Sequence, residues 1–359
     1  MTTLARSNRV RRTWWTDAVD AAGCTAYTVY NRMMLPASFG GTDVDCAHLK
    51  RAVQVWDVAC ERQVVIAGHD ADALMQRLTP RDLSRVRPGR CAYVPICKND
   101  GGMLNDPVAM RVAEDEWWVS LADGELRLWI EGMAAAGGYS VRVFEAETQP
   151  LAVQGPLANE LTGRVFGAAV RDLPFFGFGR YDFDGIAMIV SRTGYSKQGG
   201  FEIFVEEERL AMPLWDALFA VGADLEVRAG CPNLVERIEG GMLSYGNDMT
   251  DAETPFEVGL DKYVQRYDCI GGAALKRHVS DRRLMAVEME GPVPVCDRRW
   301  PVMDGERRAG HVTSAADSIE FGCGVAIGMI DRDWAPGAAV TVETQDGPRP
   351  ARLRENFWA

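Results

Sequence analysis

Apolar and polar positions alternate along much of the chain, which is the pattern of half-buried β-strands. Residues 108–112 alternate in this way, and 117–121 follow after a turn at Glu114-Asp115, so an antiparallel hairpin is predicted there. A second hairpin is predicted over 181–190, where Asp184-Gly185 separates two alternating runs. Asp-Gly suits a turn that needs positive φ at both central positions.

Strands are also predicted over 201–205 and over 340–353, the latter with its turn at Asp346-Gly347. Helical spacing of apolar residues interrupts the strands and predicts helices over 70–78, 123–133, 157–165 and 213–221. We expect Asp123 to cap the second of these helices. The first should end before Thr79-Pro80, because the residue preceding a proline avoids the helical region.

Hairpins with scattered helices predict an α+β protein with antiparallel sheets rather than a doubly wound parallel sheet. Residues 281–359 consist almost entirely of short strands and turns. We therefore expect a separate C-terminal domain there, a small β-barrel or jelly-roll-like fold, after a larger region over 1–280.

Composition narrows the class of protein. The chain has 359 residues, a net charge of −12, and 39 basic against 51 acidic side chains. This balance argues against a nucleic-acid partner, because phosphate neutralisation needs a basic face. Apolar runs are too short for a membrane span, and residues 1–12 lack the apolar segment of a secretory signal. Among the classes of protein considered, this composition leaves open an enzyme that acts on a small molecule.

Cysteine and histidine usage points to a reduced, cytoplasmic protein without a metal. The nine cysteines are odd in number and include no C-x-x-C pair, unlike a disulfide framework. The four histidines are scattered and form none of the spacings typical of zinc sites. We therefore expect no metal.

Several polar residues lie inside apolar runs and are candidates for chemistry. Strand alternation alone favours an outward-facing Glu202, whereas a buried carboxylate there would need donors such as the N–H groups of a heteroaromatic ligand. Gln154 and Ser120 also lie within apolar runs, and Arg237 and Glu239 fit a solvated helix face equally well. The Gly-rich stretches 101–106 and 194–200 match no nucleotide-binding motif, and spacing alone favours tight turns there.

Five stretches in order make the chain resemble the tetrahydrofolate-binding aminomethyltransferase superfamily, which includes the T-protein of the glycine cleavage system. The similar stretches are Gly101-Gly-Met-Leu-Asn-Asp-Pro-Val, Leu151-Ala-Val-Gln-Gly-Pro, Ser191-Arg-Thr-Gly-Tyr-Ser-Lys-Gln-Gly-Gly-Phe-Glu-Ile, Arg237-Ile-Glu-Gly-Gly-Met-Leu-Ser-Tyr-Gly-Asn-Asp-Met and Gly310-His-Val-Thr-Ser. The resemblance implies a multi-domain T-protein-like fold. Its region 1–280 would hold two interleaved subdomains, roughly 1–50 with 140–280, and 51–139.

Departures from the superfamily pattern point to a branch within it. Asn105 replaces the first acid of an Asp-Asp pair, Lys197-Gln198-Gly199 replaces Gly-Glu-Asp, and Asn247-Asp248 replaces His-Glu. Further stretches resemble the dimethylsulfoniopropionate demethylases of marine bacteria: Tyr30-Asn-Arg-Met-Met-Leu-Pro, Gln54-Val-Trp-Asp-Val-Ala-Cys-Glu-Arg-Gln-Val, Thr79-Pro-Arg-Asp-Leu-Ser and Tyr245-Gly-Asn-Asp-Met-Thr. This resemblance implies direct methyl transfer from the sulfonium to tetrahydrofolate, which gives 3-methylthiopropanoate and 5-methyltetrahydrofolate without a metal.

The resemblance also implies roles for individual residues. Glu202 and Arg237 would bind the pterin, and Tyr93 would pack against the folate. Asp106 keeps the second acid of the Asp-Asp pair at the folate, and its role in a methyl transfer stays open. The other candidates would surround the sulfonium substrate, with Tyr195 able to serve either ligand and, like Asp106, a candidate catalytic residue: Tyr30, Trp118, Ser120 and Tyr195.

Three alternatives stay open at this point. The first is a glycine cleavage aminomethyltransferase, against which Asn105 and Lys197-Gln198 count. The second is a demethylase of another onium or methoxy compound. The third is a non-catalytic folate-binding scaffold, whose K-G-C-Y-x-G-Q-E motif is absent. For any of the enzymes we expect a small-molecule substrate, no nucleic acid, no membrane, and a monomer or homodimer.

Overall fold

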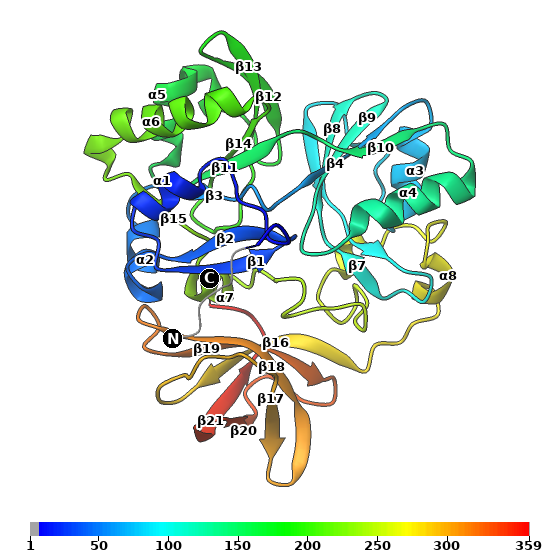
Figure 1. The fold of residues 1–359 in the computed structure, drawn as a ribbon. Helices are drawn as coiled ribbons and strands as arrows, with labels where there is room; N and C mark the ends of the chain where they lie inside the picture. Colours follow the sequence, from blue (N-terminus) through cyan, green and yellow to red (C-terminus); the bar gives the residue numbers. More distant parts are fainter. Residues whose placement is uncertain (1–6, 359) are drawn as a thin grey trace. The chain divides into compact units, whose positions relative to one another are not determined.

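The chain divides into two units in the structure, a computed structural model that describes residues 7–358 (Figure 1). The first unit comprises residues 1–75, 83–93 and 107–233, and the second comprises 76–82, 94–106 and 234–359. Residues 1–6, part of the segment used above against a secretory signal, lie outside the described residues. The two units of the structure have other boundaries than the predicted domains 1–280 and 281–359, so that division stays a prediction.

Two antiparallel sheets form the frame of the first unit. The five-stranded sheet has the order β10-β4-β9-β8-β5, with β4 Gln63–Ala67, β5 Arg90–Tyr93, β8 Val108–Ala113, β9 Glu116–Ser120 and β10 Arg142–Glu145. The six-stranded sheet has the order β12-β13-β14-β11-β3-β15, with β3 Gln54–Asp57, β11 Gln149–Gln154, β12 Phe178–Phe183, β13 Ile186–Ser191, β14 Gly200–Val205 and β15 Arg228–Gly230. Within it only β15 and β3 pair in parallel.

The remaining elements of this unit are a small hairpin and several helices. The hairpin pairs β1 Ala26–Tyr30 with β2 Met33–Ser38. The helices are α1 Thr16–Ala21, α2 Thr42–Leu49, α4 Leu126–Gly137, α5 Ala158–Phe166, α6 Ala211–Val221, the 3₁₀ turns η1 Ala168–Asp172, η2 Glu208–Leu210 and η3 Ala223–Leu225, and α3 Ala71–Leu78, whose last residues belong to the second unit.

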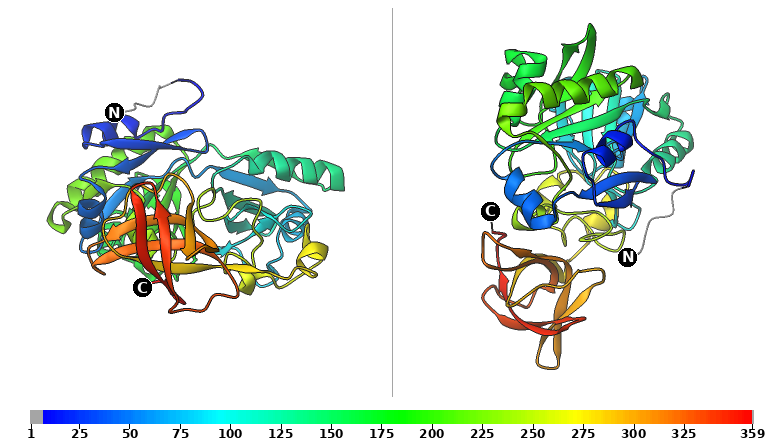
Figure 2. Two further views of the ribbon diagram at one scale, coloured as in Figure 1. Left: turned by 90° about the horizontal axis from the view of Figure 1, so that it is seen from below. Right: turned by 60° about the vertical axis from the view of Figure 1, so that its left-hand side comes forward.

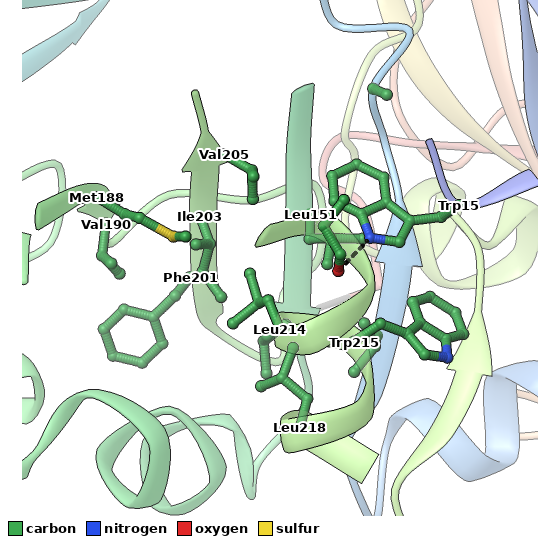
Figure 3. Close-up of a cluster of buried hydrophobic side chains, with 14 of the residues drawn as sticks. Trp15, Leu151, Met188, Val190, Phe201, Ile203, Val205, Leu214, Trp215 and Leu218 are labelled. Carbon is green, nitrogen blue, oxygen red and sulfur yellow. Dashed lines mark hydrogen bonds between the residues drawn. The ribbon is translucent and has the colours of Figure 1, made fainter. Parts of the chain in front are cut away.

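Both faces of the six-stranded sheet are covered, so its strands read as nearly continuous apolar runs. On one face Phe201 and Ile203 pack against α5 and α6, where Leu214 and Leu218 are fully buried (Figure 3). Trp15 completes this cluster, and its indole donates a hydrogen bond to the carbonyl of Ala211 at 3.0 Å. Truncation of such a leucine to alanine typically costs about 2–5 kcal/mol of stability.

The opposite face of the same sheet packs against the five-stranded sheet. Phe204 and Ile189 lie in one buried cluster with Met110 and Trp118. The rings of Trp118 and Phe204 meet edge to face, with centroids 6.3 Å apart. Side chains at every second position of β14 therefore point toward a second sheet rather than toward solvent.

A closed six-stranded barrel dominates the second unit, in orange and red in Figures 1 and 2. Trp300, Val302 and Leu353 fill its interior together with other apolar side chains. Its strands, in the order β16-β19-β18-β17-β20-β21, are β16 Arg282–Met289, β17 Trp300–Asp304, β18 Arg307–Ser318, β19 Cys323–Asp331, β20 Ala339–Thr344 and β21 Gly347–Arg354. The unit also contains β6 Ile96–Cys97, β7 Met103–Asn105, α7 Leu234–Glu239, α8 Gly272–Leu275 and η4 Asp261–Tyr263.

The predicted fold class, α+β with antiparallel sheets and a C-terminal barrel, is confirmed. The hairpin over 181–190 turns at Asp184-Gly185, whose φ values are +53° and +79°. The hairpin predicted at Asp346-Gly347 turns one residue earlier, since Thr344 pairs with Gly347.

Two predicted helix starts are also wrong. Helix α4 begins at Leu126 after Glu125, without a side-chain cap. Asp123 instead accepts a hydrogen bond from the backbone N–H of Asn31. Helix α6 begins two residues before Pro213. Within residues 7–358, no helix is long and apolar enough to cross a membrane.

Candidate functional site

Glu202 lies in β14 on the face that packs against the five-stranded sheet. Only 8 % of the residue is exposed, so the outward orientation favoured by strand alternation is wrong. Its carboxylate accepts a hydrogen bond from the hydroxyl of Thr193, which is itself bonded to the hydroxyl of Ser191. Burial raises the pKa of Glu202, and the bond from Thr193 offsets part of that rise. This site therefore contains a carboxylate with an oxygen left to accept donors.

A second carboxylate, that of Glu61, lies near Glu202. Glu61 precedes β4, and burial raises its pKa well above the usual value, with a further rise from the charge of Glu202. Like charges in one site oppose each other's ionisation. Within residues 7–358 the Glu61 carboxyl takes part in no hydrogen bond or ion pair.

The strand register places three predicted residues on the face of the five-stranded sheet that looks toward Glu202. Ser120 pairs with Gln63 on one side and with Val108 on the other, and Val108 pairs with Tyr93. These residues form one row across the sheet, and Trp118, two positions from Ser120, shares their face. The amide of Gln63 donates to the Ser120 hydroxyl at 2.7 Å and to the Glu61 carbonyl at 2.6 Å.

Trp118 packs between the two sheets of the first unit. It is 6 % exposed, and its indole N–H donates to the carboxylate of Glu116 at 2.8 Å. Trp118 also lines a pocket of about 300 Å³, together with Val65, Glu116, Phe144, Ala146, Glu147, Thr148 and Glu206.

We therefore expect Trp118→Leu to lower the free energy of unfolding by about 2 kcal/mol, because leucine cannot fill the space of the indole against Phe204. Urea unfolding followed by circular dichroism measures this change. A variant with the wild-type unfolding midpoint would show that the ring contributes little to the packing between the sheets.

Tyr195 is carried by a glycine loop that Gln154 holds in place. A Cβ atom at Gly194 would lie 2.0 Å from Gln154 Nε2, and one at Gly200 would lie 2.2 Å from a backbone carbonyl. Ser196 donates a hydrogen bond to Gln154 Oε1 at 2.7 Å. Tyr195 packs against the buried cluster around Trp56 on the Glu202 face of the sheet. The buried Gln154 thus fixes the loop that places Tyr195.

Tyr30 ends β1 immediately before a turn that is tied to the same region. Asn31, with φ of +49°, donates its side-chain amide to the carbonyl of Cys60 at 2.9 Å and to that of Leu121 at 3.4 Å. Cys60 precedes Glu61, and Leu121 follows Ser120. The turn after Tyr30 is therefore anchored to both segments that carry candidate polar side chains.

Asp106 belongs to the second unit, directly after β7. The hydroxyl of Tyr245 donates to the carbonyl of Met103 in this strand at 3.0 Å, and the N–H of Met103 donates to the carbonyl of Glu253 at 2.8 Å. The charge of Asp106 contributes to a pKa of about 12 for Tyr245, where burial is the largest cause. Tyr245 thus fixes the strand that carries Asp106.

Arg237 also belongs to the second unit and forms a buried ion pair. Its guanidinium donates to Asp248 at 2.8 Å and to Ser314 at 2.7 Å, and the Arg237 and Asp248 side chains are 7 % and 0 % exposed. Glu239 is buried too and accepts a bond from Ser318 at 2.6 Å. The interpretation of Arg237 and Glu239 as a solvated helix face is therefore wrong. Their side chains are buried and form hydrogen bonds from α7 to β18.

The predicted residues thus fall into two groups. Tyr93, Trp118, Ser120 and Glu202 lie between the two sheets of the first unit, with the segments that carry Tyr30 and Tyr195 bordering them, whereas Asp106 and Arg237 belong to the second unit. Sequence reasoning missed Glu61, Thr193 and Gln63. All three lie in stretches quoted for the resemblance, but no periodicity shows that Glu61 and Glu202 interact.

The family models match nearly all of the chain. The GCVT N-terminal domain matches residues 15–267, and the glycine cleavage T-protein C-terminal barrel domain matches 282–357. The chain therefore belongs to the glycine cleavage T-protein family, as the sequence motifs predicted.

Individual relatives narrow the comparison. The chain is 53 % identical to "Dimethylsulfoniopropionate demethylase DmdA" of Ruegeria pomeroyi, over 100 % of both chains. It is 28 % identical to an aminomethyltransferase of Bacillus cereus over 89 % of each. Among solved structures, glycine cleavage system aminomethyltransferase T of Bartonella henselae superposes with a TM-score of 0.87 at 21 % identity, covering 97 % of this chain and 98 % of that one. This last likeness supports the fold.

Proposed function

We propose that this chain demethylates dimethylsulfoniopropionate by transferring one methyl group to tetrahydrofolate. The observation that carries the proposal is the 53 % identity over the full length to a dimethylsulfoniopropionate demethylase, against 28 % to an aminomethyltransferase. The motifs of the sequence support the same activity, since Asn105 and Lys197-Gln198 depart from the aminomethyltransferase pattern.

The residues of the first unit fit the binding of a folate. A pterin presents several N–H donors on one edge, and a buried carboxylate is the acceptor that such donors need. Glu202 offers this acceptor, because Thr193 occupies its Oε2 and no residue within 7–358 donates to its Oε1. We assign Glu202 to the pterin and Tyr93 to packing against the folate.

The donor would be held by the neighbouring side chains. Aromatic faces attract a sulfonium through the ring quadrupole, so we assign Trp118 and Tyr195 to the cation, with the hydroxyl of Ser120 and Tyr30 beside it. Asp106 and Tyr195 are the proposed catalytic residues.

The main contribution of the protein to this reaction is to align the methyl donor with N5 of tetrahydrofolate. One S–CH₃ bond breaks and its electron pair goes to sulfur, which becomes a neutral thioether. The N5 lone pair of tetrahydrofolate forms the new N–CH₃ bond, and the N5 proton is released. Holding the two partners in line converts a bimolecular step into an effectively unimolecular one.

This proposal includes further properties, of which the acidic net charge supports only the absence of nucleic-acid binding. We propose a cytoplasmic enzyme that acts on a small molecule, does not bind nucleic acid, and works as a monomer or homodimer. We also propose that the transfer is independent of metal ions, because a sulfonium already carries a good leaving group.

Purified protein should form 5-methyltetrahydrofolate from tetrahydrofolate and dimethylsulfoniopropionate, at an undiminished rate after chelator treatment. The assay should include glycine betaine, dimethylsulfonioacetate and a methoxyarene, and initial rates should be those of a sequential reaction. A faster rate with another donor would change the substrate assignment. Parallel initial-rate lines would show a methylated enzyme and contradict direct transfer.

A further inference from the structure

Two buried hydroxyls and the carboxyl of Glu202 form a continuous hydrogen-bonded row, which we call the hydroxyl relay. Thr193 donates to Glu202 Oε2, and the hydroxyl oxygens of Thr193 and Ser191 lie 2.5 Å apart. Ser191, Thr193 and Glu202 are 0 %, 5 % and 8 % exposed. Ser191 of β13 pairs directly with Glu202 of β14, so both lie on one face of the six-stranded sheet. Solvent therefore contributes little to the hydroxyl relay.

The backbone around the hydroxyl relay is held in place. The N–H of Arg192 donates to the carbonyl of Gly177 at 2.8 Å, and the carbonyl of Arg192 accepts from the N–H of Phe176 at 3.1 Å. Glu202 is fixed by its strand pairing with Ser191 on one side and with Ala152 on the other. Groups on fixed backbone lose little freedom when a ligand binds, so the hydroxyl relay is pre-organised.

The direction of the two hydroxyl hydrogens depends on the state of the carboxyl. An ionised Glu202 only accepts, so Thr193 donates to it and accepts in turn from Ser191. Both hydroxyl hydrogens then have acceptors. If a protonated Glu202 donates to Thr193, the order reverses and the Ser191 hydrogen is left over, because Ser191 makes no other side-chain hydrogen bond in the part of the chain that the structure describes.

A neutral Glu202 that carries its proton on Oε1 is also less well bonded. Thr193 then donates to a neutral carbonyl oxygen, and a neutral acceptor forms a weaker hydrogen bond than a carboxylate does. Both neutral forms therefore give up hydrogen bonding that the ionised form keeps. The hydroxyl relay thus favours the carboxylate form of Glu202.

The other surroundings of Glu202 do not favour its charge. Burial raises the pKa of Glu202, whereas the bond from Thr193 lowers it. Among residues 7–358, no basic side chain forms an ion pair with Glu202. The titratable side chains that lie toward this face, or whose pKa rises with the charge of Glu202, are acids, a thiol and phenols and carry no positive charge: Glu61, Cys91, Tyr93 and Tyr195.

We propose that Ser191 and Thr193 are positioning residues for the folate site, whose hydroxyl relay holds Glu202 as an oriented carboxylate with Oε1 left to accept the N–H donors of the pterin. This inference rests on the proposed function, in which Glu202 binds the pterin. The two hydroxyls act through Glu202 and not by contact with the ligand.

Thr193→Val tests the inference in folate binding, because valine has the shape of threonine and lacks its hydroxyl. Under anaerobic conditions, the Kd of tetrahydrofolate at about pH 7 should rise about tenfold, which corresponds to a one-unit rise in the pKa of Glu202. The excess should shrink toward about pH 9, because base restores the carboxylate. Thr193→Ser keeps the hydroxyl and should restore the affinity, and Ser191→Ala should lie between the two Thr193 variants.

Thr162→Val is the matched control. Thr162 is a fully buried residue of α5, and its hydroxyl makes no hydrogen bond in the described part of the chain. The same substitution there should leave the Kd of tetrahydrofolate at the wild-type value at every pH.

The charge of Glu202 is measured without folate by ¹³C NMR of protein labelled at the glutamate carboxyls. The Glu202 signal, assigned by its loss in Glu202→Gln, should titrate about one pH unit higher in Thr193→Val than in wild type or Thr193→Ser. If Thr193→Val does not fold, Thr193→Ala is compared with Thr193→Ser in the same way.

The other outcomes contradict the inference or the proposed function separately. A Glu202 signal that titrates as in wild type overturns the inference, even where folate binding is weaker. A Kd that rises by the same factor at every pH also overturns it, because that pattern shows a purely structural effect. Wild-type protein without affinity for tetrahydrofolate overturns the proposed function and with it the folate assignment, whatever the titration of Glu202 shows.

Discussion

Alanine in place of Glu202 is expected to weaken tetrahydrofolate binding by about 2 kcal/mol or more, which is about thirtyfold in Kd. Hydrogen bonds to a charged acceptor are stronger than neutral ones, and the pterin donors would lose theirs. Isothermal calorimetry with the purified variant measures the change. Glutamine at this position should weaken binding less than alanine, because its carbonyl still accepts one bond.

The stability of the same variants separates binding from folding. Burial raises the pKa of Glu202, so the free protein gains nothing from this charge. Glu202→Gln should therefore unfold at the wild-type midpoint or above it, whereas Glu208→Ala, at an exposed site, should change neither property. Unchanged folate affinity in folded Glu202→Ala would remove Glu202 from the pterin site.

Alanine in place of Asp248 is expected to cost about 3–5 kcal/mol of stability, because it leaves a buried guanidinium without its counter-charge. Asp248 is fully buried, and besides Arg237 it accepts bonds from Thr313 and Ser314 of β18 at 2.7 and 2.6 Å. Denaturant unfolding of the variant measures the loss.

The matched control replaces both members of the ion pair with apolar residues. Asp248→Leu combined with Arg237→Met should recover much of the lost stability, since replacing both charges removes the unpaired one. A loss below about 1 kcal/mol in Asp248→Ala would mean that the ion pair is not what joins α7 and β18.

Local sequence chemistry predicted the hairpins well but not every turn. Asp184-Gly185 takes the positive φ values that its two-residue turn needs, so the dipeptide alone located it. At the last hairpin the register puts Gln345 and Asp346 in the turn, because pairing along the whole strand outweighs the preference of one dipeptide. Asp123 likewise does not cap the helix as predicted. Its carboxylate accepts a hydrogen bond from the backbone N–H of Asn31, a residue far away in sequence.

The candidate site depended on contacts that a single strand does not reveal. Alternation correctly predicts that Glu202 lies on the other face of its strand from Phe201 and Ile203. Only the packing of the second sheet explains why the face that carries Glu202 is buried. Glu61 lies on another strand connection, and besides burial the charge of Glu202 raises its pKa. The family resemblance identified Glu202 as a candidate site residue, whereas the interaction between Glu61 and Glu202 became visible only in the structure.

The most direct test of the account follows the methyl group itself. Purified protein is mixed with tetrahydrofolate and dimethylsulfoniopropionate labelled with ¹³C in its S-methyl groups, and the products are followed by NMR. We expect one label in 5-methyltetrahydrofolate for each labelled 3-methylthiopropanoate formed, with both appearing together. Labelled 3-methylthiopropanoate without labelled 5-methyltetrahydrofolate, or no consumption of the donor, would contradict the proposed methyl transfer.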